Sequence, residues 1–115
     1  MKKDDTVYLR HILDAITTVE EYLHGVTEAK FKSTKLLQDG AIRQIEIIGE
    51  AVRHVSKDLQ KTYSEVSWED IAGMRDKLIH DYFGVDLEKV WLTAEEDLPP
   101  LKKKVLEILK DYGQE

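Results

Sequence analysis

The stretch LQDGAIRQIEIIGEAVRHVSKDL, residues 37–59, shows the most regular apolar spacing in the chain. Its apolar residues recur at steps of three or four, which is the period of one face of an α-helix. They are Leu37, Ala41, Ile45, Ile48, Val52, Val55 and Leu59. The stretch therefore predicts one amphipathic helix of about six turns. Gly49 falls inside this pattern, where it costs about 1 kcal/mol relative to alanine, so we expect another helix to pass close to it.

The same spacing predicts a second amphipathic helix nearer the N-terminus, over residues 9–23. Asp4 and Asp5 precede its apolar positions and are candidate N-caps, because a short carboxylate accepts hydrogen bonds from the free N–H groups of a first turn. Gly25 is expected to end this helix. A short helical piece over residues 27–32 should then lead to the stretch quoted above.

A third helix is predicted to begin at Trp68. Ser67 is followed three residues later by Asp70, and this pair resembles a capping box, in which a hydroxyl and a carboxylate satisfy the free N–H groups. The apolar positions that follow extend this helix to Tyr82, and Gly84 supplies a stop.

The C-terminal part carries two further helix-start signals. Asp86 is a candidate N-cap for a fourth helix. Asp97 and Pro99-Pro100 combine a capping carboxylate with residues suited to a first turn, so a break or kink is expected before a last helix that runs to Tyr112. No stretch of the sequence shows a pattern typical of a β-strand. We therefore predict an all-α, up-and-down bundle of four to five helices, with residues 1–115 as a single domain.

Composition restricts the function classes. The formal net charge is −6, which is the wrong sign for a protein that holds nucleic acid by its overall field, so any nucleic-acid function needs a local basic site. Cysteine is absent, which excludes disulfides and thiolate metal sites. No apolar run approaches the roughly 20 residues that span a bilayer. We expect a cytoplasmic protein without a membrane partner.

Metal and cofactor signals are weak. The histidines His11, His24 and His54 lack the spacing of a helical zinc site and are interpreted as surface residues. Glu46 and Glu50 lie one turn apart, but the charged row around them is more simply a solvated or partner-facing stripe. Phosphate-loop, nucleophile-elbow and dinucleotide fingerprints are missing. We expect no metal and no cofactor.

Two lysine clusters could touch phosphates, although such clusters are usually solvated. They are Lys30, Lys32 and Lys35, and Lys102-Lys103-Lys104.

The segment RDKLIHDY, residues 75–82, concentrates the residue types that metal-free phosphodiester cleavage needs. Arg75 is a permanent phosphate ligand, and His80 can accept and return a proton at neutral pH. Asp76 precedes His80 by four residues, so on a helix its carboxylate could hydrogen-bond the imidazole and fix its tautomer. Arg75 and Tyr82 would share one helix side. The sequence thus offers a phosphate ligand, a base and an orienting group.

Helix geometry limits this hypothesis. Five residues rotate an ideal helix by roughly 140°, so Arg75 and His80 would flank a face rather than stack on each other. A site shared across a symmetric dimer would bring two copies of the motif to one cleft and offset the acidic background. An arginine followed five residues later by a histidine also arises by chance, on the order of once per ten chains, so the bare pair is weak evidence.

The wider stretch WEDIAGMRDKLIHDYFGVD, residues 68–86, resembles the signature of the HepT-like family within the HEPN superfamily, whose motif runs Arg-x-x-x-x-His-x-Tyr. Two more blocks, residues 45–51 and the region from Val90-Trp91 to Pro99, are similar to family blocks in the same order. The resemblance covers nearly the whole chain. The residue after the motif arginine is often asparagine in this family, and Asp76 is a polar variant of it.

This resemblance implies an all-α dimer that acts as a metal-independent endoribonuclease toxin of a type VII toxin–antitoxin system. His80 would take the proton of a ribose 2′-hydroxyl, and Arg75 would stabilise the charge on the phosphorus centre. The implied partners are an RNA substrate and a small MNT-type nucleotidyltransferase antitoxin. Tyr82 matches the family tyrosine to which the antitoxin attaches AMP.

Two other functions stay open from the sequence. The chain could be a catalytically silent HEPN subunit that binds a nucleotidyltransferase or a nucleotide. It could also be a plain interaction bundle, in which Arg75 and His80 only solubilise a helix end. The presence of Arg75, His80 and Tyr82 in one motif favours the ribonuclease.

Overall fold

The computed structural model describes residues 3–78 and 84–113. Within these residues every regular element is a helix, so the predicted all-α class is confirmed. The elements run α1 (Lys3–Leu23), α2 (Glu28–Lys32), α3 (Lys35–His54), α4 (Lys57–Thr62), α5 (Trp68–Ala72), α6 (Met74–Leu78), α7 (Leu87–Leu92), the π-helical turn η2 (Thr93–Asp97) and α8 (Leu98–Asp111).

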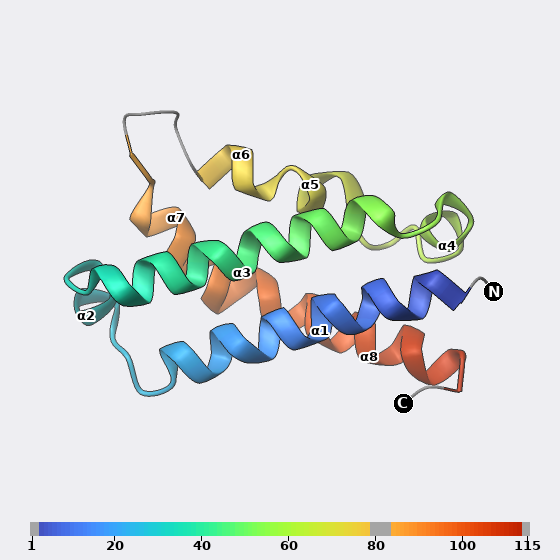
Figure 1. Ribbon diagram of the computed structural model, residues 1–115, viewed down its shortest axis with the longest axis horizontal. Helices are drawn as coiled ribbons and strands as arrows, with labels where there is room; N and C mark the ends of the chain where they lie inside the picture. The colour runs from blue at the N-terminus through green and yellow to red at the C-terminus, as the bar shows by residue number, and fades with distance from the viewer. Residues whose placement is uncertain (1–2, 79–83, 114–115) are drawn as a thin grey trace.

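Three long helices form the body of the bundle (Figure 1). Helix α1 packs against both α3 and α8, and it runs antiparallel to each of them. The shorter helices α5, α6 and α7 lie against the other side of α3. None of the helices in the described part of the chain is both long and apolar enough to span a bilayer.

The predicted apolar faces of the two long N-terminal helices are buried. The stripe of α1 is 0–7% exposed and consists of Leu9, Ile12, Ile16, Val19 and Leu23. The α3 stripe is equally buried from Ala41 to Val55, with Leu37 partly buried at its start. Gly25 follows α1 with a φ of 72°, a conformation that glycine adopts without the penalty of a side chain.

The helix predicted over residues 37–59 is two helices rather than one. The chain is extended at Val55, with φ −68° and ψ 136°, and Ser56 caps α4 by accepting a hydrogen bond from Leu59 N–H. The carboxylate of Asp5 stabilises this break, because it accepts hydrogen bonds from Ser56 N–H at 2.8 Å and from Ser56 Oγ at 2.7 Å. Apolar spacing continues through the break, so it could not reveal this contact.

Asp4 and Asp5 are not N-caps, because α1 begins at Lys3 and both residues lie inside it. Two other predicted caps were also wrong. Ser67 precedes α5 without a side-chain capping bond, and Asp97 makes none at the start of α8. At the place where a break or kink was expected before Pro99-Pro100, the chain forms a π-helical turn that leads directly into α8. Asp86 does cap α7, because its carboxylate accepts a hydrogen bond from Lys89 N–H.

The helix predicted from Trp68 to Tyr82 begins at Trp68 but is interrupted at Gly73, which ends α5 before α6 starts at Met74. Residues 79–83, which include its predicted end, lie outside the described residues. Breaks at Val55 and Gly73, together with the turn η2, give the described residues more helical segments than the four or five expected.

Candidate functional site

Helices α5 and α6 carry the candidate site and are held on α3 by a few buried side chains. Trp68 is 5% exposed and donates its indole N–H to Tyr63 O at 3.0 Å. Met74 and Leu78 bury the inner face of α6. The expected close approach at Gly49 is confirmed, because a Cβ atom built there would lie 3.1 Å from Ala72 O at the end of α5. Only glycine lets the two backbones come so close without a shift.

Arg75 leaves the outer face of α6 and lies half exposed, with 50% of its side chain accessible. Its Nε–H donates to Glu46 Oε2 on α3 at 2.5 Å. The hydrogen bond to Glu46 and the negative charge of that carboxylate raise the pKa of Arg75 above its ordinary value. The side chain therefore stays cationic and is tied to the long helix α3.

Glu46 is itself the best-shielded member of this group, with 27% of its side chain accessible. Its other oxygen, Oε1, lies 3.9 Å from Arg43 Nη1, one turn earlier on α3. The charges therefore alternate from α3 to α6: Arg43 is positive, Glu46 is negative and Arg75 is positive. The sequence interpretation placed Glu46 on a solvated or partner-facing stripe and missed its contact with Arg75. The only signal was Gly49, one turn further along α3, which marked a close helix contact there.

Asp76 contacts Arg75 within the described residues. Its Oδ1 lies 3.7 Å from Arg75 Nη1, and 73% of its side chain is accessible. The predicted contact from Asp76 to His80 required a continuous helix across residues 76–80, and α6 is described only to Leu78. His80 and Tyr82 lie outside the described residues. The structure therefore places Arg75 and Asp76 side by side and leaves the roles of His80 and Tyr82 as predictions.

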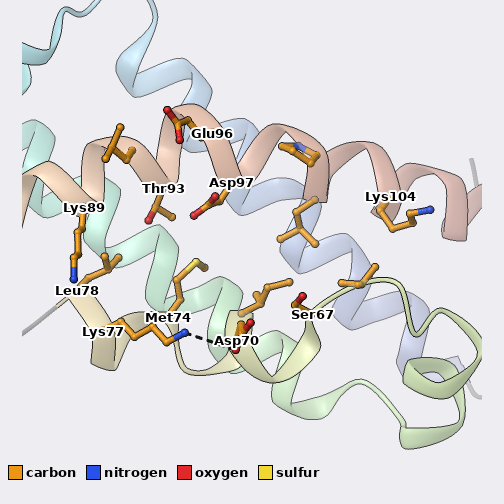
Figure 2. A pocket seen from close by; sticks show the side chains of 15 residues that line it. Ser67, Asp70, Met74, Lys77, Leu78, Lys89, Thr93, Glu96, Asp97 and Lys104 are labelled. Atoms are coloured by element: carbon orange, nitrogen blue, oxygen red, sulfur yellow. Dashed lines mark ion pairs between the residues drawn. The ribbon is translucent and has the colours of Figure 1, made fainter.

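A groove of about 860 Å³ lies on the other side of α5 and α6 (Figure 2). Met74 and Leu78 line one wall, and Thr93 and Asp97 of η2 line the opposite wall. On the first wall, Lys77 of α6 points toward Asp70 of α5, with 3.6 Å between Lys77 Nζ and Asp70 Oδ1. Arg75 does not line this groove. The site around Arg75 and the groove are therefore on different sides of α6.

The two lysine clusters are largely engaged in ion pairs within the chain. Lys102 binds Glu20 at 2.7 Å, which ties α8 to α1, and Lys104 binds Glu65 at 2.9 Å. The hydrogen bond from Lys104 lowers the pKa of Glu65 below its ordinary value. In the other cluster, Lys32 pairs with Glu28 and Lys35 with Asp39. These contacts favour the interpretation of both clusters as structural surface residues.

The remaining histidines occupy the surface, as predicted. His54 Nε2 lies 3.1 Å from Glu50 Oε2, and its ring stacks on Tyr8 with 5.0 Å between ring centroids. Arg53 also pairs with Glu50, at 3.6 Å. Among the described residues, Glu46 and Glu50 thus bind different cations, and no group of side chains is arranged to hold a metal ion.

Comparison with known proteins gives consistent matches across the chain. The family model described as Ribonuclease HepT-like matches residues 12–108. The gamma-glutamylcyclotransferase and putative RNase of Methanocaldococcus jannaschii is 44% identical over 114 residues, which are 99% of this chain. The chain spans only about half of that protein, 51% of its length.

Two shorter relatives match along most of both chains. A putative RNase of Caldanaerobacter subterraneus is 43% identical over 90% of this chain and 92% of its own length. The probable ribonuclease HepT of Thermococcus cleftensis is 41% identical over 96% of this chain and all of its own length. No solved structure gives a significant match. Because the family model and these relatives cover most of the chain, the protein belongs to the HepT-like ribonuclease family.

Proposed function

We propose that this chain is a metal-independent endoribonuclease that acts as the toxin of a toxin–antitoxin pair. The observation that carries the proposal is the placement of Arg75, which is half exposed on α6 and held by Glu46. A guanidinium in this position can bind a phosphate while its orientation is fixed. Arg75 also stands five residues before His80 in a chain of a ribonuclease family.

The proposed chemistry uses the RNA's own 2′-hydroxyl as the nucleophile. His80 takes the proton of the 2′-hydroxyl, the 2′-oxygen bonds to the adjacent phosphorus, and the bond from phosphorus to the 5′-oxygen breaks as the protonated His80 gives its proton to that oxygen. Arg75 stabilises the charge that develops on the phosphoryl oxygens. The products carry a 2′,3′-cyclic phosphate and a 5′-hydroxyl, so no water and no metal ion enters the cleavage step.

The direct test is cleavage of a single-stranded RNA by the purified protein in EDTA, with analysis of the new ends. We expect 2′,3′-cyclic phosphate ends from wild type. Replacing His80 by alanine should lower the rate by roughly 10²–10⁴, which is the contribution of a general base, without loss of helix content by circular dichroism. Cleavage that depends on added Mg²⁺, or an equally active His80→Ala protein, would contradict this mechanism.

Asp76 is proposed to orient the imidazole of His80. A carboxylate partner raises the pKa of a histidine, and a general base works only when it is deprotonated. Asp76→Ala should therefore lower activity less than His80→Ala and shift the acidic limb of the pH–rate profile to lower pH. Because Asp76 also lies 3.7 Å from Arg75, a lower rate with an unshifted profile would mean that it acts through the arginine instead.

The proposed partner is an MNT-type nucleotidyltransferase that transfers AMP from ATP to the hydroxyl of Tyr82. The phenolic oxygen would attack the α-phosphorus of ATP and release pyrophosphate. The added bulk and negative charge would lie near Arg75 in sequence and would weaken RNA binding by occlusion and repulsion. Incubation with the partner and ATP should add AMP to wild type and not to Tyr82→Phe. Mass added at Tyr8, Tyr22, Tyr63 or Tyr112 would refute this assignment.

The functional unit is proposed to be a symmetric dimer, because the net charge of −6 leaves one arginine alone in an acidic field. Two copies of the motif in one cleft would concentrate positive charge where RNA enters. Light scattering of the purified protein gives the mass directly. Cleavage by a monomer at the concentrations where activity is measured would contradict a shared site.

A further inference from the structure

We propose that Glu46 is the positioning residue for Arg75 in RNA cleavage, an inference that rests on the ribonuclease function proposed above. Glu46 lies 29 positions before Arg75 in the chain, on a different helix, and its Oε2 accepts the Nε–H of Arg75 at 2.5 Å. Among the described side chains that pair with Arg75, Glu46 provides the hydrogen bond, while Asp76 lies at 3.7 Å.

The geometry of the contact leaves the phosphate-binding edge of Arg75 available. A guanidinium carries five N–H donors, and Glu46 engages the one on Nε. The four donors on the two terminal nitrogens remain, and these form the fork that binds two phosphate oxygens together. Asp76 lies beside Nη1 but is highly exposed, so a phosphate can displace it. Glu46 can therefore stay bound to Arg75 while RNA binds.

Helix α3 supplies a firmer support than α6 itself. The described part of α6, Met74–Leu78, follows a break at Gly73 and so does not continue the helix of α5. Glu46 stands between Ile45 and Ile48, which are 1% and 0% exposed in the core. At Gly49, close packing fixes the end of α5 on α3. Glu46 thus connects the reactive side chain to the most firmly packed element near it.

Stability is not an adequate alternative role for this pair. Arg75 is half exposed, and ion pairs between exposed side chains contribute little to folding because water screens their attraction. A displacement of a catalytic group by about 1 Å, in contrast, can cost up to about 10²-fold in rate. The pair is thus expected to affect catalysis much more than folding.

The experiment compares three single variants on the same RNA in EDTA. Glu46→Ala should lower kcat by roughly 10- to 100-fold with a smaller change in KM, because the arginine is present but not oriented. Glu46→Gln keeps an oxygen that accepts the Nε–H bond and should recover most of this loss. Glu50→Ala is the matched control, one turn further along α3, because Glu50 pairs with Arg53 and His54 instead. It should cleave like wild type.

A second measurement reports the contact without any cleavage. The ¹⁵N resonance of Arg75 Nε, assigned by its absence in Arg75→Lys, should exchange slowly with solvent in wild type and fast in Glu46→Ala. If wild type cleaves and Glu46→Ala cleaves equally fast or faster, the positioning role is wrong and only the ribonuclease proposal stands. If wild type does not cleave RNA, the ribonuclease proposal fails and the catalytic role of Glu46 fails with it. A fast-exchanging wild-type resonance would overturn the contact itself.

Discussion

The body of three long helices and the run of short helices from α4 to α7 are stabilised in different ways. Helices α1, α3 and α8 bury apolar side chains at regular intervals, from Leu9 in α1, from Ala41 in α3 and from Leu98 in α8, and these stripes form one continuous core. In the short helices, only one or two buried residues per helix provide the apolar contacts. They are Leu59, Trp68, Met74, Leu78 and Val90. The polar contact of Asp5 with Ser56 and the close backbone packing at Gly49 supply the rest.

The candidate chemistry lies on the second region. Both regions expose cations, such as Arg43 on α3 and Arg75 on α6, but the described part of α6 has only two buried residues to anchor it. The orientation of the Arg75 side chain therefore depends on contacts from elsewhere in the chain. The comparison therefore predicts that substitutions of buried apolar residues in the body mainly change stability, while substitutions in the short helices change stability less and activity more.

The largest stability effect is expected for Ile48→Ala in the body. Ile48 is 0% exposed, so the substitution removes buried methyl groups and leaves a cavity. We expect a loss of about 2–5 kcal/mol in the free energy of unfolding, measured by urea denaturation. A loss below about 1 kcal/mol would mean that the core of α3 can collapse around the smaller side chain, which would weaken the contrast between the two regions.

The next largest effect on stability is expected at Asp5, which connects α1 to the start of α4. Its side chain is 3% exposed and accepts two hydrogen bonds from Ser56. Asp5→Ala leaves the partly buried Ser56 N–H without this partner and should cost about 1–3 kcal/mol in the free energy of unfolding. Asp58→Ala is a control, because this exposed residue lies in the first turn of α4 without the contact to α1. An equal loss in both variants would point to helix electrostatics rather than to the long-range contact.

These two positions also show what the sequence could and could not predict. The burial of Ile48 follows from the period of apolar residues, which is a local property, and the long helices were predicted for the same reason. Asp5 was misinterpreted as an N-cap because its partner, Ser56, is 51 positions away. The break that this pair stabilises is invisible to apolar spacing, which runs on to Leu59.

The same distinction applies to the candidate site. Arg75 was singled out by the residue types around it and by the resemblance of residues 68–86 to the HepT-like signature. Glu46 was not, because a carboxylate in a charged row gives no sign of its partner, and here the partner lies on another helix. The break at Gly73 was missed because the apolar positions Ile71, Met74 and Leu78 keep helical spacing across it.

Gly73→Ala should separate stability from activity in the short helices. Gly73 has a φ of −90°, and an added Cβ would meet only ordinary contacts, at 3.5 Å from Glu69 O. Alanine reduces the freedom of the unfolded chain and favours helix, so we expect a gain of about 0.4–1 kcal/mol. If alanine also joins α5 and α6 into one continuous helix, and the break orients Arg75, cleavage should fall although the protein is more stable. Wild-type cleavage by a stabilised variant with increased helix content would show that the break is not needed for the site.

A similarly small effect on stability is expected for Tyr63→Phe, which removes a hydrogen bond between the two regions. Tyr63, between α4 and α5, donates its hydroxyl to Asp111 at the end of α8 at 2.8 Å. Partial burial, together with the hydrogen bond to Asp111, raises the pKa of Tyr63 to about 12. A folded-state pKa above the unfolded value near 10 means that the contribution is fully present below pH 10 and is lost as pH rises through about 12. Because Asp111 is exposed, Tyr63→Phe should lose about 0.5–1 kcal/mol in the free energy of unfolding at neutral pH.

Urea denaturation of wild type and Tyr63→Phe between pH 8 and 12 measures this difference in the free energy of unfolding. The difference should shrink as the pH rises, because only wild type has this hydrogen bond to lose. A difference that stays constant to pH 12 would assign the effect to ring packing, such as the edge contact with Tyr112, rather than to the hydroxyl.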